Sequence, residues 1–375
     1  MSPTPDPELT RLLSAALGSV QDPELRRPIT DLGMVASAEA YDDRSATVHV
    51  LLTIAGCPLR NTIVEDVTAA ATSVPGIAAV DVELGVMTPE QRQALKDGLT
   101  SRVVPFTQPN SLTRVIGVAS GKGGVGKSSL TVNLACALAA DGLRVGVIDA
   151  DVHGFSVPGL MGITQAPTRV DELILPPVAH GVKVISIGMF VEGNQPVVWR
   201  GPMLHRALEQ FLTDVHFGDL DVLLLDLPPG TGDIAISVSQ LLPGSQLLVV
   251  TTPQSAAAEV AERAGAVAET TGQEVVGVVE NMSWLQLPDG TRMEPFGAGG
   301  GAALAERLQS RLGVDVPLLG SVPLEPQLRE GGDAGVPIVV SRPESAASQE
   351  IRGIAHRLAR RPRGLAGLRL DVTPR

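Results

Sequence analysis

Short and almost wholly apolar runs recur along the chain from residue 113 onward, and such runs are typical of strands buried on both faces. They comprise residues 113–119, 143–151, 182–187, 221–226, 246–250, 274–279 and 316–319. Segments with the apolar spacing of helices lie between several of them, at residues 129–140, 203–215 and 255–271 and in a stretch that ends near residue 312. This alternation predicts an α/β fold with a mostly parallel sheet and helices on both of its faces.

The first part of the chain has a different pattern. Residues 6–17 carry leucines on one helical face, residues 46–54 and 77–84 have the composition of strands, and a helix is expected from Pro58 to about Ser73. These elements predict a small α+β domain of about 85 residues, a size that can fold independently.

Together these patterns predict a chain of four segments. The small α+β domain spans residues 1–88, a helix and a proline-containing linker span 89–112, the large α/β domain spans 113–361, and a flexible tail spans 362–375. The last helix of the large domain, near residues 349–361, has apolar residues on one face and arginines elsewhere. Two interpretations stay open for it: packing on the core with its charges solvated, or binding to a membrane surface.

Composition narrows the class of protein. Aromatic residues make up 2% of the 375 residues, so the core must be built from Val, Leu, Ile and Ala. The 29 basic and 41 acidic residues give a net charge of −12, which argues against a nucleic-acid partner because phosphate contacts need a basic face. Two cysteines do not make a disulfide framework. Since we find neither an apolar run long enough to span a membrane nor a signal layout, we expect a cytoplasmic protein without stable membrane association.

A glycine-rich stretch follows the first apolar run of the large domain and precedes a helix. Residues 121–128, Gly-Lys-Gly-Gly-Val-Gly-Lys-Ser, fit the phosphate-loop pattern G-x-x-x-x-G-K-[ST]. Glycines let backbone N–H groups turn inward as an anion-binding nest, and the helix N-terminus adds partial positive charge. We expect Lys127 to reach the outer phosphates of ATP and Ser128 to ligate Mg²⁺; the alternative is a glycine-rich turn that happens to precede a lysine. The residues expected to bind nucleotide here are Gly121, Lys122, Gly123, Gly124, Val125, Gly126, Lys127, Ser128 and Ser129.

Lys122 is a second lysine within the same loop. It lies too close to the glycines to contact its own nucleotide as well as Lys127 does. One use for it is to cross a dimer interface and neutralise charge on the partner's nucleotide, as an arginine finger does. The alternative is a solvated loop lysine.

Carboxylates close two of the apolar runs. Asp149 and Asp151 end one run and Asp226 ends another, at the strand ends where parallel sheets bind ligands. Asp226 is expected beside Ser128, where it organises Mg²⁺. If the strand still runs at Asp151, spacing of two puts Asp149 and Asp151 on one face, so that one holds a Mg²⁺-bound water and the other orients the attacking water. A pair of turn aspartates is the alternative.

The stretch after Asp226 combines rigid and flexible residues. Residues 227–233, Leu-Pro-Pro-Gly-Thr-Gly-Asp, would let the backbone approach a γ-phosphate and change shape on hydrolysis. The alternative is a sharp turn between a strand and a helix.

Three further residues are candidates for binding. Asn281 follows a strand and is expected either to read adenine through its amide or to serve as a cap or turn residue. Pro323 lies in the loop after the last strand, where a base can be gripped. Cys57, at a predicted helix N-terminus that favours thiolate, is either a metal or cluster ligand or a small apolar residue packed under the start of the helix.

Several motifs together resemble the Mrp/ApbC iron–sulfur cluster carrier family, one of the deviant phosphate-loop ATPases related to the MinD and ParA proteins. In the large domain the resemblance rests on Gly121–Ser128 with Lys122, Asp149-Ala150-Asp151, Asp226-Leu227-Pro228-Pro229-Gly230-Thr231-Gly232-Asp233 and Asn281-Met282-Ser283. In the first domain it rests on Asp22-Pro23-Glu24, Asp31-Leu32-Gly33, Gly56-Cys57-Pro58-Leu59 and Pro75-Gly76, which are similar to a small domain often fused to these carriers.

The resemblance implies a homodimer that binds and slowly hydrolyses ATP with Mg²⁺ and holds a transferable iron–sulfur cluster for client apo-proteins. It also implies roles for individual residues. Lys122 acts across the dimer, Lys127 binds phosphate, Ser128 and Asp226 organise Mg²⁺, and Asp151 positions the water.

This sequence departs from the family in one respect. Many members carry a C-x-x-C pair after the Asn-Met-Ser segment, whereas residues 284–295 contain no cysteine here. Iron–sulfur clusters need thiolate ligands, and two copies of Cys57 supply two of the four that ordinary clusters use. Besides a cluster carrier, we therefore consider a nucleotide-gated protein scaffold and a positional ATPase of the MinD/ParA kind, neither of which holds a cluster itself.

Overall fold

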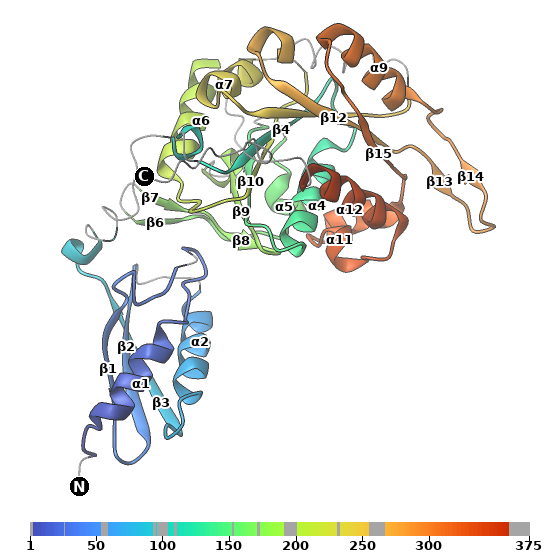
Figure 1. Cartoon of the computed structure of the whole chain (residues 1–375). Coiled ribbons are helices and arrows are strands. Elements are labelled where there is room, and N and C mark those ends of the chain that lie inside the picture. The colour runs from blue at the N-terminus through green and yellow to red at the C-terminus, as the bar shows by residue number, and fades with distance from the viewer. Residues whose placement is uncertain are drawn as a thin grey trace, which may run out of the picture. The chain divides into compact units, whose positions relative to one another are not determined.

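The computed structural model describes residues 3–25, 27–53, 59–92, 95, 104–108, 111–151, 154–170, 173–190, 201–230, 233–254 and 267–359. They form two compact units (Figure 1). The first unit contains residues 1–103, 165–178 and 213–218, and the second contains the rest of the chain. In the part that is described, no helix is long and apolar enough to cross a membrane.

The first unit is a three-stranded sheet covered by two helices. Its elements are α1 (Pro7–Leu17), β1 (Val35–Ala40), β2 (Ser45–Leu52), α2 (Arg60–Thr72) and β3 (Ala79–Val86), and the strand order is β1-β2-β3. Strand β2 pairs antiparallel with β1 and parallel with β3. The Asp6 carboxylate caps α1 by accepting from the N–H groups of Glu8 and Leu9, as an N-cap residue does. The predicted small α+β domain therefore has its expected elements.

Two segments from later in the chain complete this unit. Strands β6 (Thr168–Val170) and β7 (Leu173–Leu175) pair antiparallel, and Val170, Leu173 and Leu175 belong to the same buried cluster as Leu13 of α1. The Thr168 hydroxyl donates to the Glu24 carboxylate over 2.8 Å. The unit is thus discontinuous in sequence, and the continuous boundaries expected at residues 88 and 113 stay predictions.

The second unit is built on an eight-stranded sheet of order β15-β12-β11-β4-β10-β5-β9-β8. The strands are β4 (Arg114–Ser120), β5 (Val145–Asp149), β8 (Val178–Ala179), β9 (Val182–Ser186), β10 (Val222–Asp226), β11 (Gln246–Thr251), β12 (Glu274–Asn281) and β15 (Leu318–Val322). All pairings from β15 to β9 are parallel, so the mostly parallel sheet is confirmed.

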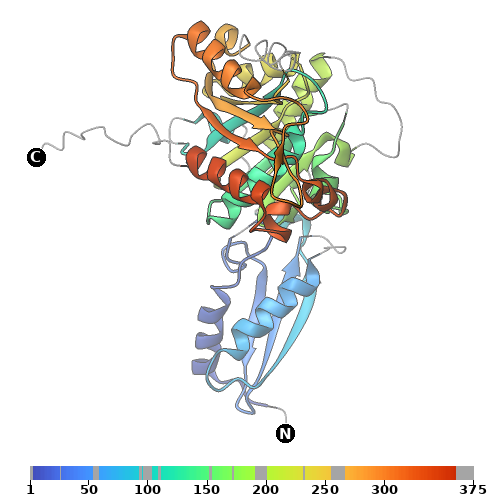
Figure 2. The same cartoon turned by 90° about the vertical axis from the view of Figure 1, so that its right-hand side faces the viewer.

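Helices cover both faces of this sheet, as expected. On one side lie α4 (Lys127–Ala140), α5 (Val157–Leu160), α11 (Ile338–Ser341) and α12 (Ala346–Ala359), and on the other lie α7 (Asp233–Leu241) and α9 (Gly300–Leu312) (Figures 1 and 2). The remaining helices are α6 (Gly201–Asp214) and α10 (Pro326–Asp333). A short antiparallel hairpin of β13 (Leu285–Gln286) and β14 (Arg292–Met293) follows β12.

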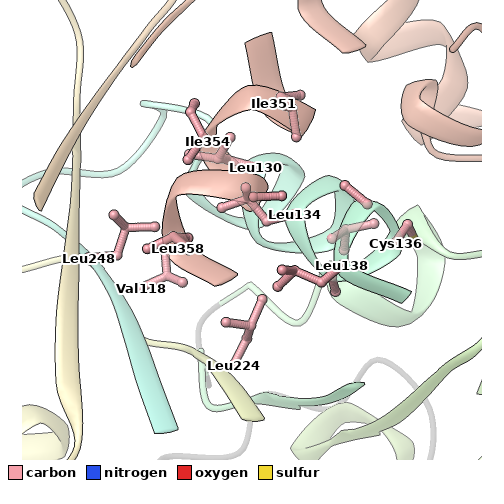
Figure 3. Packing of buried hydrophobic residues seen from close by; sticks show 14 of the residues in the cluster. Val118, Leu130, Leu134, Cys136, Leu138, Leu224, Leu248, Ile351, Ile354 and Leu358 are labelled. Carbon is pink, nitrogen blue, oxygen red and sulfur yellow. The ribbon is translucent and has the colours of Figure 1, made fainter. Parts of the chain in front are cut away.

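The core between the sheet, α4 and α12 consists of small aliphatic side chains. Leu130, Leu134 and Leu138 of α4 lie against Leu224 of the sheet and Ile354 of α12 (Figure 3). From Leu130 to Leu138, α4 is buried all round, so packing fixes the helix that follows the glycine-rich loop.

The last predicted elements differ from the structure in their bounds. Strand β15 begins two residues after the expected start at residue 316, and α12 begins at Ala346 rather than near 349. Helices α5, α10 and α11 and strands β1, β6, β7 and β8 were not expected. Most of them are only two to four residues long, and so short a segment carries no readable period.

Replacing Leu224 by Ala tests the account of the core. The side chain is fully buried in the middle of β10, so we expect the free energy of unfolding to fall by about 2–5 kcal/mol. The control is Val314→Ala, because Val314 is 51% exposed and should change stability by less than about 0.5 kcal/mol. Chemical denaturation measures both, and equal effects would contradict the assignment.

Candidate functional site

The glycine-rich stretch forms the loop between β4 and α4. Gly124 and Gly126 have φ angles of 80° and 78°, in the left-handed region that side chains with a Cβ rarely adopt. Gly126 precedes the first residue of α4 and has no side chain with which to cap it, so the first N–H groups of the helix are left for a ligand. The Ser120 hydroxyl donates to the Lys122 carbonyl over 3.0 Å and closes the start of the loop.

The sheet topology places this loop at the point where the order of the strands in the sheet reverses. From β4 the chain passes to β5 on one side of β10, and from β10 it passes to β11 on the other side of β4. Ligands of open α/β sheets bind at the carboxyl ends of strands at such a reversal. The register pairs Asp226, the last residue of β10, with both Val118 and Asp149.

Lys127 points into a cluster of carboxylates at these strand ends. Its Nζ donates to Asp226 Oδ1 over 2.7 Å and lies 3.8 Å from Asp151 Oδ2. The side chains of Lys127 and Asp226 are 6% and 0% exposed. The three residues that the sequence assigns to phosphate, Mg²⁺ and water therefore meet in one buried place.

Asp226 bonds to more groups than the sequence predicts. Ser128 Oγ donates to Asp226 Oδ2 over 2.5 Å, so Ser128 lies beside Asp226 as expected. Thr131 Oγ1 donates to Asp226 Oδ1 over 3.0 Å. Thr131 was missed, although its position one helical turn after Lys127 was a signal that places it on the same side of α4.

Asp149 differs from its expected arrangement. Strand β5 ends at Asp149, so the condition that would put Asp149 and Asp151 on one strand face is not met, and their roles at Mg²⁺ and water stay predictions. The Asp149 carboxylate accepts from Ser186 Oγ over 3.0 Å and from the N–H groups of Asp151 and Val157. Burial, with a smaller effect of the Asp226 charge, raises the pKa of Asp149 to about 7. Ser186 was not expected at the site.

Lys122 lies on the outer side of the loop. Its Nζ donates to Gln254 Oε1 over 2.9 Å, at an exposed position. Gln254, three residues beyond the end of β11, was not singled out in the sequence. Lys122 therefore does not join the cluster around Asp226, and its action across a dimer stays a prediction.

The two candidates for base recognition lie at the ends of neighbouring strands. Asn281 ends β12, and its Nδ2 donates to the Val125 carbonyl over 2.8 Å. Pro323 is buried and directly follows β15. Their contact with adenine stays a prediction, as does that of Ser129 with nucleotide; the Ser129 carbonyl accepts from Asn133 Nδ2 over 2.8 Å.

The loop after Asp226 lies next to the phosphate loop. The Leu227 N–H donates to the Val118 carbonyl over 3.1 Å and the Gly230 N–H to the Ser120 carbonyl over 2.8 Å. Residues 231–232 lie outside the described residues. Helix α7 starts at Asp233, so the stretch does connect a strand to a helix.

Cys136 is poorly suited to metal binding. It lies in α4 among the buried leucines, and burial raises the pKa of its thiol to about 12 (Figure 3). Cys57, the other candidate, lies outside the described residues, as does the predicted helix start at Pro58. Within the described ranges, no group of three or more His, Cys, Asp or Glu residues has the arrangement of a metal site.

Replacing Asp226 by Asn tests the charge cluster. The change keeps the size of the side chain but leaves the buried Lys127 ammonium without its nearest counter-charge, so we expect a loss of about 3–5 kcal/mol in the free energy of unfolding. The matched control is Asp219→Asn, whose side chain is 91% exposed and pairs with Arg144 over 3.6 Å. Denaturant titration of the unliganded protein should show no measurable change for the control. An equally stable Asp226→Asn protein would contradict the cluster.

Labelling of Cys136 tests its burial. Thiolate is the reactive form of cysteine, and a thiol with a pKa of about 12 stays protonated at neutral pH. In a Cys57→Ser background we expect no reaction of the native protein with an alkylating reagent at pH 7, and one modified thiol per chain after denaturation. Rapid labelling of the native protein would show that Cys136 is accessible.

Known proteins resemble this chain over its whole length. Residues 111–359 match the ParA family described as NUBPL iron-transfer P-loop NTPase, and residues 12–84 match the iron–sulfur cluster assembly protein family. The iron–sulfur cluster carrier protein of Mycobacterium tuberculosis is 61% identical over 378 residues, which cover 100% of this chain and 99% of the relative. The protein of that name from Synechocystis is 40% identical over 358 residues, with 93% and 97% covered.

A solved structure shares its fold with most of this chain. It is the nucleotide-binding protein of Archaeoglobus fulgidus in complex with ADP, with a TM-score of 0.53 and 34% sequence identity. The match covers 63% of this chain and 90% of that one. Motifs, fold and relatives agree, and the chain belongs to the iron-transfer P-loop NTPases, the family of the iron–sulfur cluster carrier proteins.

Proposed function

We propose that this protein is a homodimeric, Mg²⁺-dependent ATPase that carries iron–sulfur clusters or assists their assembly. The observation that carries the proposal is the group of buried Lys127, Asp151 and Asp226 and half-buried Ser128 at the carboxyl ends of β4, β5 and β10. A lysine, a hydroxyl and two carboxylates next to a glycine loop are the parts that phosphoryl transfer needs.

The phosphate loop and Lys127 would bind the triphosphate of ATP. Lys127 already lies among carboxylates, so binding exchanges its contact with Asp226 for phosphate oxygens. The exchange keeps the buried ammonium paired and releases Asp226 for a cation. Lys127 is therefore proposed to hold the outer phosphates in position as charge develops on them.

Ser128 and Asp226 fit a Mg²⁺ ion. They offer the hydroxyl and carboxylate oxygens that this cation prefers, and they lie within hydrogen-bond distance of each other. When bound, Mg²⁺ neutralises charge on the transferred phosphate. Thr131 keeps the Asp226 carboxylate oriented through its hydroxyl.

Asp151 and Asp149 are proposed to have different roles in the reaction. Asp151 is 8% exposed and faces Lys127, so it is the proposed residue that orients the attacking water. Asp149 accepts from the Asp151 N–H over 3.2 Å and is itself held by Ser186 and Val157, so it is proposed to fix the backbone at Asp151 and to lie near the cation. Pro323 remains the proposed contact of the adenine base.

The homodimer is proposed to bring Lys122 to the nucleotide of the second chain. Lys122 lies on the outer side of the loop, and its partner Gln254 is neutral and exposed. An exposed hydrogen bond of this kind is weak, so Lys122 is readily released to an anion presented by another chain.

The iron–sulfur cluster is cargo in this proposal. Relatives of the chain are named as carriers, yet residues 284–295 contain no cysteine and Cys136 is buried with a raised pKa. Cys57 is the one other thiol in the sequence, so each chain of a dimer offers it as a ligand and a client or assembly partner supplies the remaining thiolates.

A second function is favoured by the same cysteine count. A protein that lacks the family's C-x-x-C pair could still change its partners with nucleotide, because the chain matches both the P-loop NTPase family and the cluster assembly family. It would then act as a nucleotide-gated scaffold for cluster assembly and would hold no cluster itself.

Lysine variants test the ATPase proposal. Lys127→Ala should weaken ATP binding about 10- to 100-fold, because a charged hydrogen bond to phosphate is lost. Lys122→Ala should bind ATP as the wild type does but hydrolyse it about 1,000-fold more slowly, since its charge acts from the partner chain. Calorimetry and phosphate release measure the two effects. Normal turnover by Lys122→Ala would rule out the lysine acting in trans.

Anaerobic reconstitution tests the cargo. With iron, sulfide and a client apo-protein, we expect a cluster absorption band that is lost in Cys57→Ser. Cys136→Ser is the matched control and should retain the band, since the Cys136 thiol is buried. A wild-type protein without iron or sulfide, alone or with its partner, would favour the scaffold over the carrier.

A further inference from the structure

One side chain from outside the phosphate loop bonds to the backbone at the loop's turn. Asn281 is 5% exposed, and its Nδ2 donates to the Val125 carbonyl over 2.8 Å. The two residues are 156 positions apart in sequence, so the contact joins β12 to the loop after β4. Breaking this bond would leave a buried amide and a buried carbonyl without a partner, which costs free energy for each of the two groups.

The same amide lies against the next residue of the loop. A Cβ added to Gly126 would collide with Asn281 Nδ2, and it would lie 3.6 Å from Met282 Cε. Met282 itself has a φ of 58°, which is uncommon for a residue that is not glycine. Asn281 and Met282 thus form a wall directly behind the turn of the loop.

The wall is held in place from the other side. The Ser283 N–H donates to the Val322 carbonyl over 3.0 Å, and the Leu324 N–H donates to the Trp284 carbonyl over 2.7 Å. Ser283 Oγ also donates to the Glu280 carbonyl over 3.0 Å. Hydrogen bonds before and after Asn281 fix the position of this segment. Its contact with the phosphate loop can therefore restrain the conformation of the loop.

The planar peptide bond between Val125 and Gly126 links this contact to the direction of the Gly126 N–H. In a trans peptide the carbonyl of Val125 and the N–H of Gly126 point in opposite directions. Fixing the carbonyl toward Asn281 therefore directs the Gly126 N–H away from Asn281, where an anion held by the loop can accept it.

We infer that Asn281 is a positioning residue for the phosphate loop, which it sets for binding the triphosphate through Val125 and Gly126. This inference rests on the proposed nucleotide binding. It differs from recognition of adenine, because its effect requires only the phosphates of the ligand and is the same for any base.

Inorganic tripolyphosphate, which has no base, separates the two roles. We expect Asn281→Ala and Asn281→Leu to weaken the binding of Mg²⁺-tripolyphosphate, Mg²⁺-ATP and Mg²⁺-GTP by a common factor of about 5 to 10 in calorimetry. Gln286→Ala is the matched control, because it removes a side-chain amide hydrogen bond, from Gln286 Nε2 to the Gly290 carbonyl over 3.0 Å, that lies in the hairpin after this segment and does not touch the loop; it should keep wild-type affinities. Thermal melting confirms that each variant is folded at the temperature of titration.

Two results would overturn the inference. If both Asn281 variants keep wild-type affinity for tripolyphosphate while the ratio of ATP to GTP affinity changes, the residue reads the base and does not set the loop. If the wild-type protein binds none of the three ligands, the proposed nucleotide binding fails as well, and the two failures are thus distinguishable.

Discussion

A fully buried carboxylate at the end of one central strand holds the site together. Asp226 accepts from the Lys127 ammonium and from the hydroxyls of Ser128 and Thr131, and its own backbone carbonyl accepts from Ala150. A charge in this position costs several kcal/mol of desolvation unless it is paired, so sheet, loop and helix must fit around it together. The same ion pair keeps Lys127 beside the place where phosphate is proposed to bind.

The scaffold explains how these groups reach one another. Parallel strands of short aliphatic side chains end at one edge of the sheet, and α4 is buried along its length beneath α12. Both features fix the direction of the loop between β4 and α4. Glycines at 124 and 126 then supply the left-handed backbone that the turn requires.

The sequence contained much of this arrangement but not its details. Periodicity and the glycine pattern located the sheet, the loop, Lys127 and Asp226, because these depend on local spacing. The orientation of Asp149 toward Ser186, the bond from Asn281 to Val125 and the joining of β6 and β7 to the first unit were not readable. Each depends on contacts between segments that lie tens of residues apart, and no local pattern marks such contacts.

The central claim is that the Lys127 and Asp226 pair opens to take up a nucleotide triphosphate and its cation. Calorimetric titration of the unliganded protein with ATP, in the presence and absence of Mg²⁺, tests it most directly. The account predicts one ATP bound per chain and markedly weaker binding without Mg²⁺, since Asp226 then remains uncompensated after Lys127 leaves it. Absence of binding, or identical affinity with and without Mg²⁺, would contradict it.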